Sequence, residues 1–466
     1  MKRLIQPGRL TRAVSHLDEE TAVHSSRKRK TTTAVAALVA LPLSLSACSA
    51  GSLGSSDGDA EGTTINFLVD PADSSVKPAQ AMADAFHAAN PDITVELETR
   101  PAGTEGDNLI KTRLSTGSMA DIFSYNSGSL FQQIDPAKNL VPLTSESFAG
   151  DVSDAFKPNV SVGDELYGVP IGTAFGGGVV YNKDVYAELG LSVPTTWDEF
   201  IANSQKIKDS GDGVAPVVQT YGETWTSQLF VLGDFHNVAA AEPSFADDYT
   251  ANKAKYATDP AAIKGFEHLQ QVHDLGLTNS DFASATLADG LRMVADGTGA
   301  QYPMLSAVAA GGLETAAGGD TDNVGFFALP GDDAATNGLT AWYPNGAYIP
   351  TSTTGAELEA AKKFAAFIAS PEGCEAQTSA SPPTGPYLVT GCELPSDVTA
   401  LTQDVNAYFE DDKQSPALEF LSAVKGPSLE QITVQVGSGI STAAEGAALY
   451  DQDVEKQAQQ LGLEGW

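Results

Sequence analysis

The stretch Tyr181-Asn182-Lys183-Asp184-Val185-Tyr186, followed by Pro194-Thr195-Thr196-Trp197-Asp198-Glu199-Phe200, decides the fold. The apolar residues that lead into Tyr181 are β-branched, which predicts a strand. Residues 184–189 predict a short helix that ends at a glycine. Thr196 and Glu199 have the capping-box spacing, which predicts that a second helix starts here. The stretch therefore reads strand, helix, turn, helix.

Strand and helix signals alternate in the same way along most of the chain. Short apolar or alternating runs predict strands over 65–69 and 93–97, and Ile122-Phe123 opens another. The segments between them predict helices over 78–89 and 108–116. This alternation predicts an α/β fold with largely parallel sheets.

The N-terminal region has the pattern of a secretory leader. The basic cluster Arg27-Lys28-Arg29-Lys30 precedes an apolar run, and Leu45-Ser46-Ala47-Cys48 follows it. Cys48 after small residues resembles the bacterial lipobox, so we expect residues 1–47 to be removed and Cys48 to carry lipid. The alternative is an ordinary signal peptide with an incidental cysteine. The apolar run is well short of the roughly 20 residues that span a bilayer.

The composition argues against nucleic acid as a partner. The 466 residues carry a net charge of −34. The leader holds eight Lys/Arg and three acids, so 26 − 8 = 18 basic and 60 − 3 = 57 acidic side chains remain, a charge of −39. Such a surface repels phosphates, which argues against binding nucleic acid. Residues 48–64 are rich in glycine, serine and acidic residues, which predicts a flexible linker.

Cysteines are scarce in this chain. If Cys48 carries lipid, Cys374 and Cys392 remain. In an extracytoplasmic protein such a pair is most simply a disulfide, which would contribute roughly 3 kcal/mol. Two free, buried thiols are the alternative.

Several motifs together resemble one family. The segment 181–200 is close to a "YNKD…LGL…P-x-TWDEF" block, Tyr167-Gly168-Val169-Pro170 matches a second signature, and Leu114–Phe123 matches a third with Ala120 where proline is usual. Ser370-Pro371-Glu372-Gly373 matches a fourth. These segments resemble the extracellular solute-binding proteins of bacterial ABC importers, in the carbohydrate-binding subfamily.

The resemblance implies a two-lobed α/β fold of the periplasmic-binding-protein type II, with hinge-crossing strands and a ligand cleft between the lobes. We expect 65–172 with about 300–345 in lobe 1, and 173–299 with about 346–466 in lobe 2. The resemblance also implies an oligosaccharide ligand, ABC permease subunits as partners, and no cofactor or metal. It further implies a monomer anchored through Cys48 to the extracellular face of the cell membrane.

Sugar recognition uses aromatic faces and side chains that form hydrogen bonds to hydroxyls, so aromatic residues beside polar ones in loops after strands are the candidates. Trp225 with Glu223 is the strongest pair, because the two share a face if their segment is extended. The glycine run 176–178 beside Phe175 predicts close approach of a ligand. The candidate ligand-binding residues are Trp225, Glu223, Tyr125, Asn126, Trp342, Phe175, Asn345, Asp70, Tyr302 and Asp234.

Enzyme signals are missing or misplaced. The chain has no H-E-x-x-H motif, and its G-x-S-x-G match at 54–58 lies in the linker without a strand or helix. No G-K-[ST] phosphate loop occurs. We therefore expect a binding protein that delivers a carbohydrate to a permease. A same-fold protein for a polyol, sugar phosphate or peptide, and a secreted glycan-active enzyme or adhesin, are the alternatives.

Overall fold

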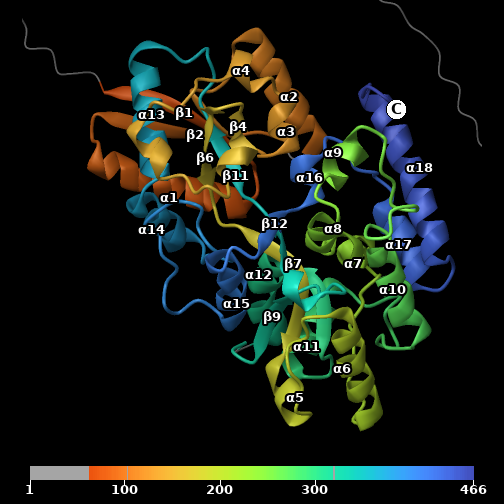
Figure 1. Ribbon diagram of the computed structural model, residues 1–466. Helices are drawn as coiled ribbons and strands as arrows, with labels where there is room; N and C mark the ends of the chain where they lie inside the picture. Colours follow the sequence, from red (N-terminus) through yellow and green to blue (C-terminus); the bar gives the residue numbers. More distant parts are fainter. Residues whose placement is uncertain (1–61, 102, 319–320) are drawn as a thin grey trace, which may run out of the picture. The chain divides into compact units, whose positions relative to one another are not determined.

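The computed structural model describes residues 62–101, 103–318 and 321–466 (Figure 1). The leader, Cys48 and nearly all of the linker lie outside the described residues, so lipidation at Cys48 stays a prediction. Within the described ranges, no helix has both the length and the apolar character needed to cross a membrane.

The first sheet is mixed, with the strand order β2-β1-β3-β11-β6. β1 pairs in parallel with β2 and β3, whereas β11 runs antiparallel to β3 and β6. Its strands are β1 (Thr63–Val69), β2 (Ile93–Thr99), β3 (Ile122–Tyr125), β6 (Gly168–Ile171) and β11 (Asn345–Tyr348). The carboxyl ends of β1 and β3 meet at the edge where β11 begins.

The second sheet is built around β7, and its order is β12-β10-β7-β8 with β9 also on β7. Its strands are β7 (Phe175–Asn182), β8 (Gln301–Leu305), β9 (Val324–Ala328), β10 (Leu339–Trp342) and β12 (Gln414–Pro416). β7 is antiparallel to β8, β9 and β10. The prediction of largely parallel sheets is therefore wrong for this sheet, in which β10 and β12 form the parallel pair. The alternation of strand and helix signals shows where strands lie in the sequence but not in which direction they run in the sheet.

Two sets of helices cover the sheets, as Figure 1 shows. The first apolar core joins the first sheet to its helices, and two further cores surround the second sheet. Around the first sheet lie α1 (Asp73–Ala89), α2 (Gly103–Thr116), α3 (Ser129–Gln132), α4 (Pro136–Asn139), α13 (Gly355–Ile368) and α14 (Pro371–Ala380). A small hairpin, β4 (Ser161–Val162) and β5 (Glu165–Leu166), accompanies them.

The larger set belongs to the second sheet. It comprises α5 (Lys183–Glu188), α6 (Trp197–Ser210), α7 (Leu229–Leu232), α8 (Phe235–Ala241), α9 (Phe245–Thr250), α10 (Lys264–Asp274), α11 (Leu287–Asp296), α12 (Ser306–Ala317), α15 (Ala400–Glu410), α16 (Leu418–Leu421), α17 (Leu429–Gly437) and α18 (Ala443–Leu461). Short 3-10 turns are η1 (Ser147–Gly150), η2 (Lys157–Val160), η3 (Thr224–Gln228) and η4 (Ala334–Thr336).

The capping box predicted from the sequence is confirmed at the start of α6. The Thr196 hydroxyl accepts the Glu199 N–H, and the Glu199 carboxylate accepts the Thr196 N–H. Two orphan donors are satisfied in this way. Trp197 then lies buried, with its ring stacked on His268 at 3.7 Å, so it is a core residue as the sequence suggested.

The predicted division between the lobes needs correction after residue 300. We define the first lobe as 62–171 with 345–392, and the second lobe as 175–342 with 400–466. Residues 301–342 supply β8, β9 and β10 to the second sheet, and β11 returns to the first. The prediction had placed 300–345 in the first lobe and 346–466 in the second. The structure instead puts 301–342 in the second lobe and 345–392 in the first, and it agrees with the prediction for 400–466. An alternating pattern shows that a strand exists, but the sheet it joins depends on distant partners.

The predicted disulfide is present. Cys374 in α14 is bonded to Cys392, and the two are 18 residues apart. The bond closes the loop that carries 381–387 along residues 172–174, which connect the two lobes, and the Ala174 N–H donates to the Pro386 carbonyl at 2.9 Å.

Candidate ligand-binding cleft

A cavity of about 830 Å³ lies where the two lobes meet. On the first-lobe side it is lined at the ends of β1, β3 and β6 by Val69, Ser124 and Ile171, and by the start of β11 at Asn345. Loops at the carboxyl ends of parallel strands are the usual place for ligand sites in open α/β sheets. We call this cavity the cleft.

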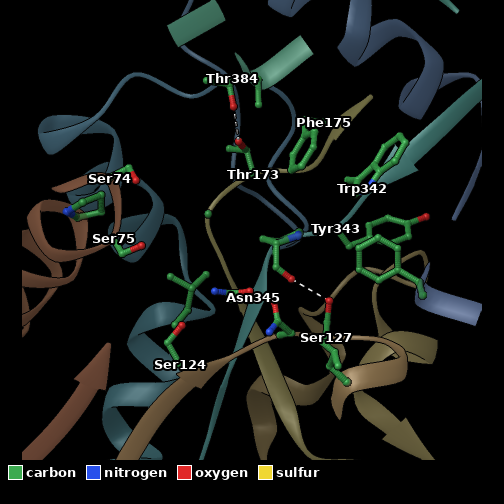
Figure 2. Close-up of a pocket in the computed structure, with 18 of the residues that line it drawn as sticks. Ser74, Ser75, Ser124, Ser127, Thr173, Phe175, Trp342, Tyr343, Asn345 and Thr384 are labelled. Carbon is green, nitrogen blue, oxygen red and sulfur yellow. Dashed lines mark hydrogen bonds between the residues drawn. The ribbon is translucent and has the colours of Figure 1, made fainter. Parts of the chain in front are cut away.

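Two crossings of the chain between the lobes line the cleft: residues 172–174 join β6 to β7, and residues 343–344 join β10 to β11. The first-lobe segment 381–387 runs beside the first of these crossings. The Ser127 hydroxyl donates to the Pro344 carbonyl at 2.9 Å, and the Thr173 and Thr384 hydroxyls lie 3.3 Å apart (Figure 2). These bonds tie the two crossings to residues of the first lobe.

Two aromatic rings from the second sheet face the cleft together. Phe175 and Trp342 are cross-strand partners on β7 and β10, and their rings lie 6.1 Å apart at an interplanar angle of 10° (Figure 2). Gly177 leaves room for the indole, because a Cβ added there would lie 2.6 Å from Trp342 Cζ3. The predicted role of the glycine run needs correction at this position: it admits a protein ring rather than a ligand.

Trp342 is held from its other side by α16. Its Nε1–H donates to Glu419 Oε1 at 2.7 Å, and Glu419 Oε2 forms an ion pair with Lys425 at 3.2 Å. Both charged side chains line the cleft. A hydrogen bond from a neutral donor to a charged acceptor is stronger than one between neutral groups, so the indole has a fixed orientation.

The opposite wall is made of small polar side chains. Ser74 and Ser75 come from the first turn of α1, on the other side of the view in Figure 2. The sequence predicted that this helix begins at Pro78, but it begins at Asp73. Pro78 has no N–H to donate to the Ser74 carbonyl, so the first turn of α1 lacks that helical hydrogen bond.

Four of the ten sequence-predicted ligand residues line the cleft: Asn126, Phe175, Trp342 and Asn345. Asn126 directly follows β3, and Asn345 opens β11 on the neighbouring strand. The structure therefore brings these two amides to one edge of the first sheet, because the end of β3 lies beside the start of the antiparallel strand β11.

Three other candidates are buried in the protein, and their predicted role needs correction. Tyr125 and Tyr302 have no exposed surface, and Asp234 is 2% exposed. The Tyr302 hydroxyl bonds to Thr220, and burial raises the pKa of Asp234 to about 8. In each case the side chain points from its strand or helix start into the core, so no face is left for a ligand.

The remaining candidates lie outside the lining of the cleft. Glu223 accepts the Leu287 N–H at the start of α11 and the Trp225 Nε1–H at 3.4 Å, while Trp225 packs on the second lobe's core. Asp70 lies 3.7 Å from Arg100. Trp225 lies in the 3-10 turn η3, which directly follows Glu223, so the extended conformation assumed for this segment from the sequence is wrong.

Several residues that line the cleft were not predicted from the sequence. Ser74, Thr173, Tyr343, Thr384, Glu419 and Lys425 all contribute to the cleft. Burial raises the pKa of Tyr343 to about 12, so its phenol stays protonated. The position of Tyr343 directly after Trp342 was a usable signal, whereas nothing near Glu419 in the sequence marks it. Among the described residues, no cluster of side chains suits a metal ion.

A family model for the bacterial extracellular solute-binding protein matches residues 72–373. The chain belongs to this family. Two relatives support the assignment. The multiple sugar-binding protein of Streptococcus mutans serotype c is 26% identical over 294 residues, covering 61% of this chain and 66% of that protein, just under two thirds. The melibiose/raffinose/stachyose-binding protein MelE of Bacillus subtilis is 22% identical over 82% of this chain and 86% of its own.

Solved structures show the same fold. The binding protein msme from Bacillus subtilis, in an open conformation, has a TM-score of 0.70 at 17% identity and covers 87% of this chain and 100% of its own. Apo RafE from Streptococcus pneumoniae has a TM-score of 0.69 at 20% identity, covering 85% and 99%. The two-lobed type II fold expected from the sequence motifs is thereby confirmed.

Proposed function

We propose that this solute-binding protein takes an oligosaccharide in its cleft. The observation that carries the proposal is the pair of parallel rings, Phe175 and Trp342, beside walls of hydroxyl and amide groups. Aromatic faces stack on the apolar face of a sugar, and hydroxyls and amides bind its rim. A cavity near 830 Å³ is in the upper part of the typical range, roughly 300–1,000 Å³, which favours an oligosaccharide over a single hexose.

The relatives support the same class of ligand. The matched proteins are named for multiple sugars and for melibiose, raffinose and stachyose, and a structure of RafE is described in complex with raffinose. Because identity is low, these names favour carbohydrate as a class and leave the choice of sugar to experiment.

The wider role follows from the family. We propose that the protein presents its sugar to the transmembrane subunits of an ABC importer, acts as a monomer outside the cell, and is anchored through lipid on Cys48. Cys48→Ala should release the protein from the membrane fraction. Retention of Cys48→Ala in that fraction would contradict the anchor.

A thermal-shift screen of the purified protein against neutral mono- and oligosaccharides tests the ligand class. A sugar that binds the folded state raises the melting temperature by mass action, by an amount that grows with its concentration above Kd. Calorimetry with the best sugar should give a one-to-one complex. No shift across raffinose, stachyose, chitin and xylan oligosaccharides would favour a non-sugar solute in the same cleft.

A further inference from the structure

The charge of the cleft is confined to one ion pair. Among the described residues that line it, Glu419 and Lys425 are the ones with charged side chains, and they pair with each other at 3.2 Å. Both are partly exposed, with 37% and 42% of their side-chain surface accessible. The cleft therefore contains two opposite charges, and its net charge is zero.

Glu419 has contacts on three sides. Its carboxylate accepts from Trp342 Nε1 and pairs with Lys425, while its backbone carbonyl accepts from the Ser129 hydroxyl of the first lobe at 2.6 Å. The carboxylate is thus committed to two groups of the cleft. Lys425 forms its ion pair with Glu419, so the net charge of the cleft depends on this one carboxylate.

We propose that Glu419 determines the charge specificity of the cleft. It cancels the charge of Lys425 and orients Trp342, so the cleft accepts neutral glycans and discriminates against anionic ones such as uronates. This inference rests on the proposed function and deepens it, because it names the class of sugar.

Without the negative charge of Glu419, Lys425 would be an unpaired charge in the cleft. Charges interact more strongly at the rim of a protein cavity than in bulk water, because the effective dielectric constant is lower. An unpaired Lys425 ammonium would attract a carboxylate on the ligand, whereas the paired one offers little net attraction. The net charge of −34 adds a general repulsion of anions, but no variant changes it by more than one charge from wild type.

Glu419→Gln separates the two roles of the residue. Glutamine has nearly the same shape and keeps an acceptor for Trp342 Nε1, but it leaves Lys425 unpaired. Lys425→Met removes the cation, and the double variant Glu419→Gln/Lys425→Met restores a neutral cleft. Asp411→Asn is the matched control, because Asp411 pairs with Lys413 at 3.1 Å on the exposed surface of the second lobe and does not line the cleft.

The probes are a neutral oligosaccharide and its own carboxylate form. Raffinose and raffinose oxidised to a carboxylate at galactose C6 are the first pair, followed by the corresponding pair for whichever neutral sugar gives the largest thermal shift. Calorimetry then gives the ratio of the two dissociation constants for each variant, at low salt and at 0.5 M NaCl.

Wild type and Asp411→Asn should bind the neutral sugar more tightly than its carboxylate form. In Glu419→Gln the ratio should shift toward the anion by roughly fivefold, as expected for a partly exposed charge pair. High salt should remove most of this shift. Lys425→Met should not gain the anion, and the double variant should return to the wild-type ratio.

Three results would overturn the inference. They are an unchanged ratio in Glu419→Gln, a change that persists in the double variant, and an equal loss of both sugars in Glu419→Gln, which would leave Glu419 as a support for Trp342 alone. If wild type binds no neutral sugar of the panel, the proposed function fails first and the inference fails with it.

Discussion

Two tryptophan–glutamate pairs in the second lobe can be compared directly. Trp225 donates to Glu223, two residues away, at 3.4 Å, and Trp342 donates to Glu419, 77 residues away, at 2.7 Å. The local pair serves the second lobe itself, because Glu223 also accepts the Leu287 N–H at the start of α11. The remote pair lines the cleft. The same two residue types therefore have different roles, which depend on the elements that bring them together.

The largest expected effect distinguishes the two tryptophans. Trp342→Ala should weaken oligosaccharide binding by about 3 kcal/mol, because it removes a buried aromatic anchor from the cleft. Trp225→Ala should change binding by less than about 0.5 kcal/mol, as expected for a residue outside the contact surface. Calorimetry measures both, with circular dichroism as the check on folding. Comparable losses in the two variants would contradict the comparison.

The second largest effect is expected from a methyl group added at Gly177, which packs against Trp342. Gly177→Ala places a methyl group against Trp342 Cζ3, where only 2.6 Å is available, so overpacking should cost about 2 kcal/mol of stability and weaken sugar binding. Urea denaturation and calorimetry test this. Gly150→Ala is the control, because no atom lies within 4 Å of a Cβ added there. If both variants keep wild-type affinity, the ring does not depend on this glycine.

Asp234, a buried acid of the second lobe, should make the stability of the protein depend on pH. Asp234 follows Gly233, whose carbonyl accepts the Thr340 hydroxyl of β10 at 2.6 Å. Desolvation raises the pKa of Asp234 to about 8. The folded state therefore holds a proton that the unfolded state, with a pKa near 3.9, has lost. This stabilisation is complete below about pH 4 and is lost as the pH rises toward 8.

Asp234→Asn should remove that dependence. Between pH 6 and pH 7, the free energy of unfolding of wild type should fall by about 1.4 kcal/mol relative to the variant. Chemical denaturation at each pH gives the difference, and the depressed pKa of His268, which burial lowers to about 3, is common to both proteins and cancels. Parallel stability curves would show that Asp234 is ionised in the folded state.

The smallest effect is expected at the local pair. Glu223→Ala removes the acceptor for the Leu287 N–H and should cost about 1 kcal/mol of stability, as for loss of a helix cap. Glu223→Gln keeps an acceptor and should cost less. Neither variant should alter sugar affinity, and a tenfold loss of affinity in either would place this pair in the binding site after all.

The family's sequence motifs and the helix caps could be predicted from the sequence, because each depends on residues close together in the chain. The strand β7, the helix α6 and its Thr196–Glu199 box depend on residues within a few positions of one another. The pairing of Cys374 with Cys392 followed from the scarcity of cysteines. Asn126 was found because it follows a strand, where ligand sites occur in α/β sheets, and Asn345 because it lies in the loop that follows Trp342.

The sequence by itself determined the elements, the family and a surface unsuited to anions, since each depends on composition or on nearby residues. Tertiary structure alone decided that β8 to β10 join β7, that Tyr125 and Tyr302 are buried, and that Glu419 reaches Trp342. These outcomes are long-range pairings, and a local pattern carries no information about which distant strand or helix will pack against it.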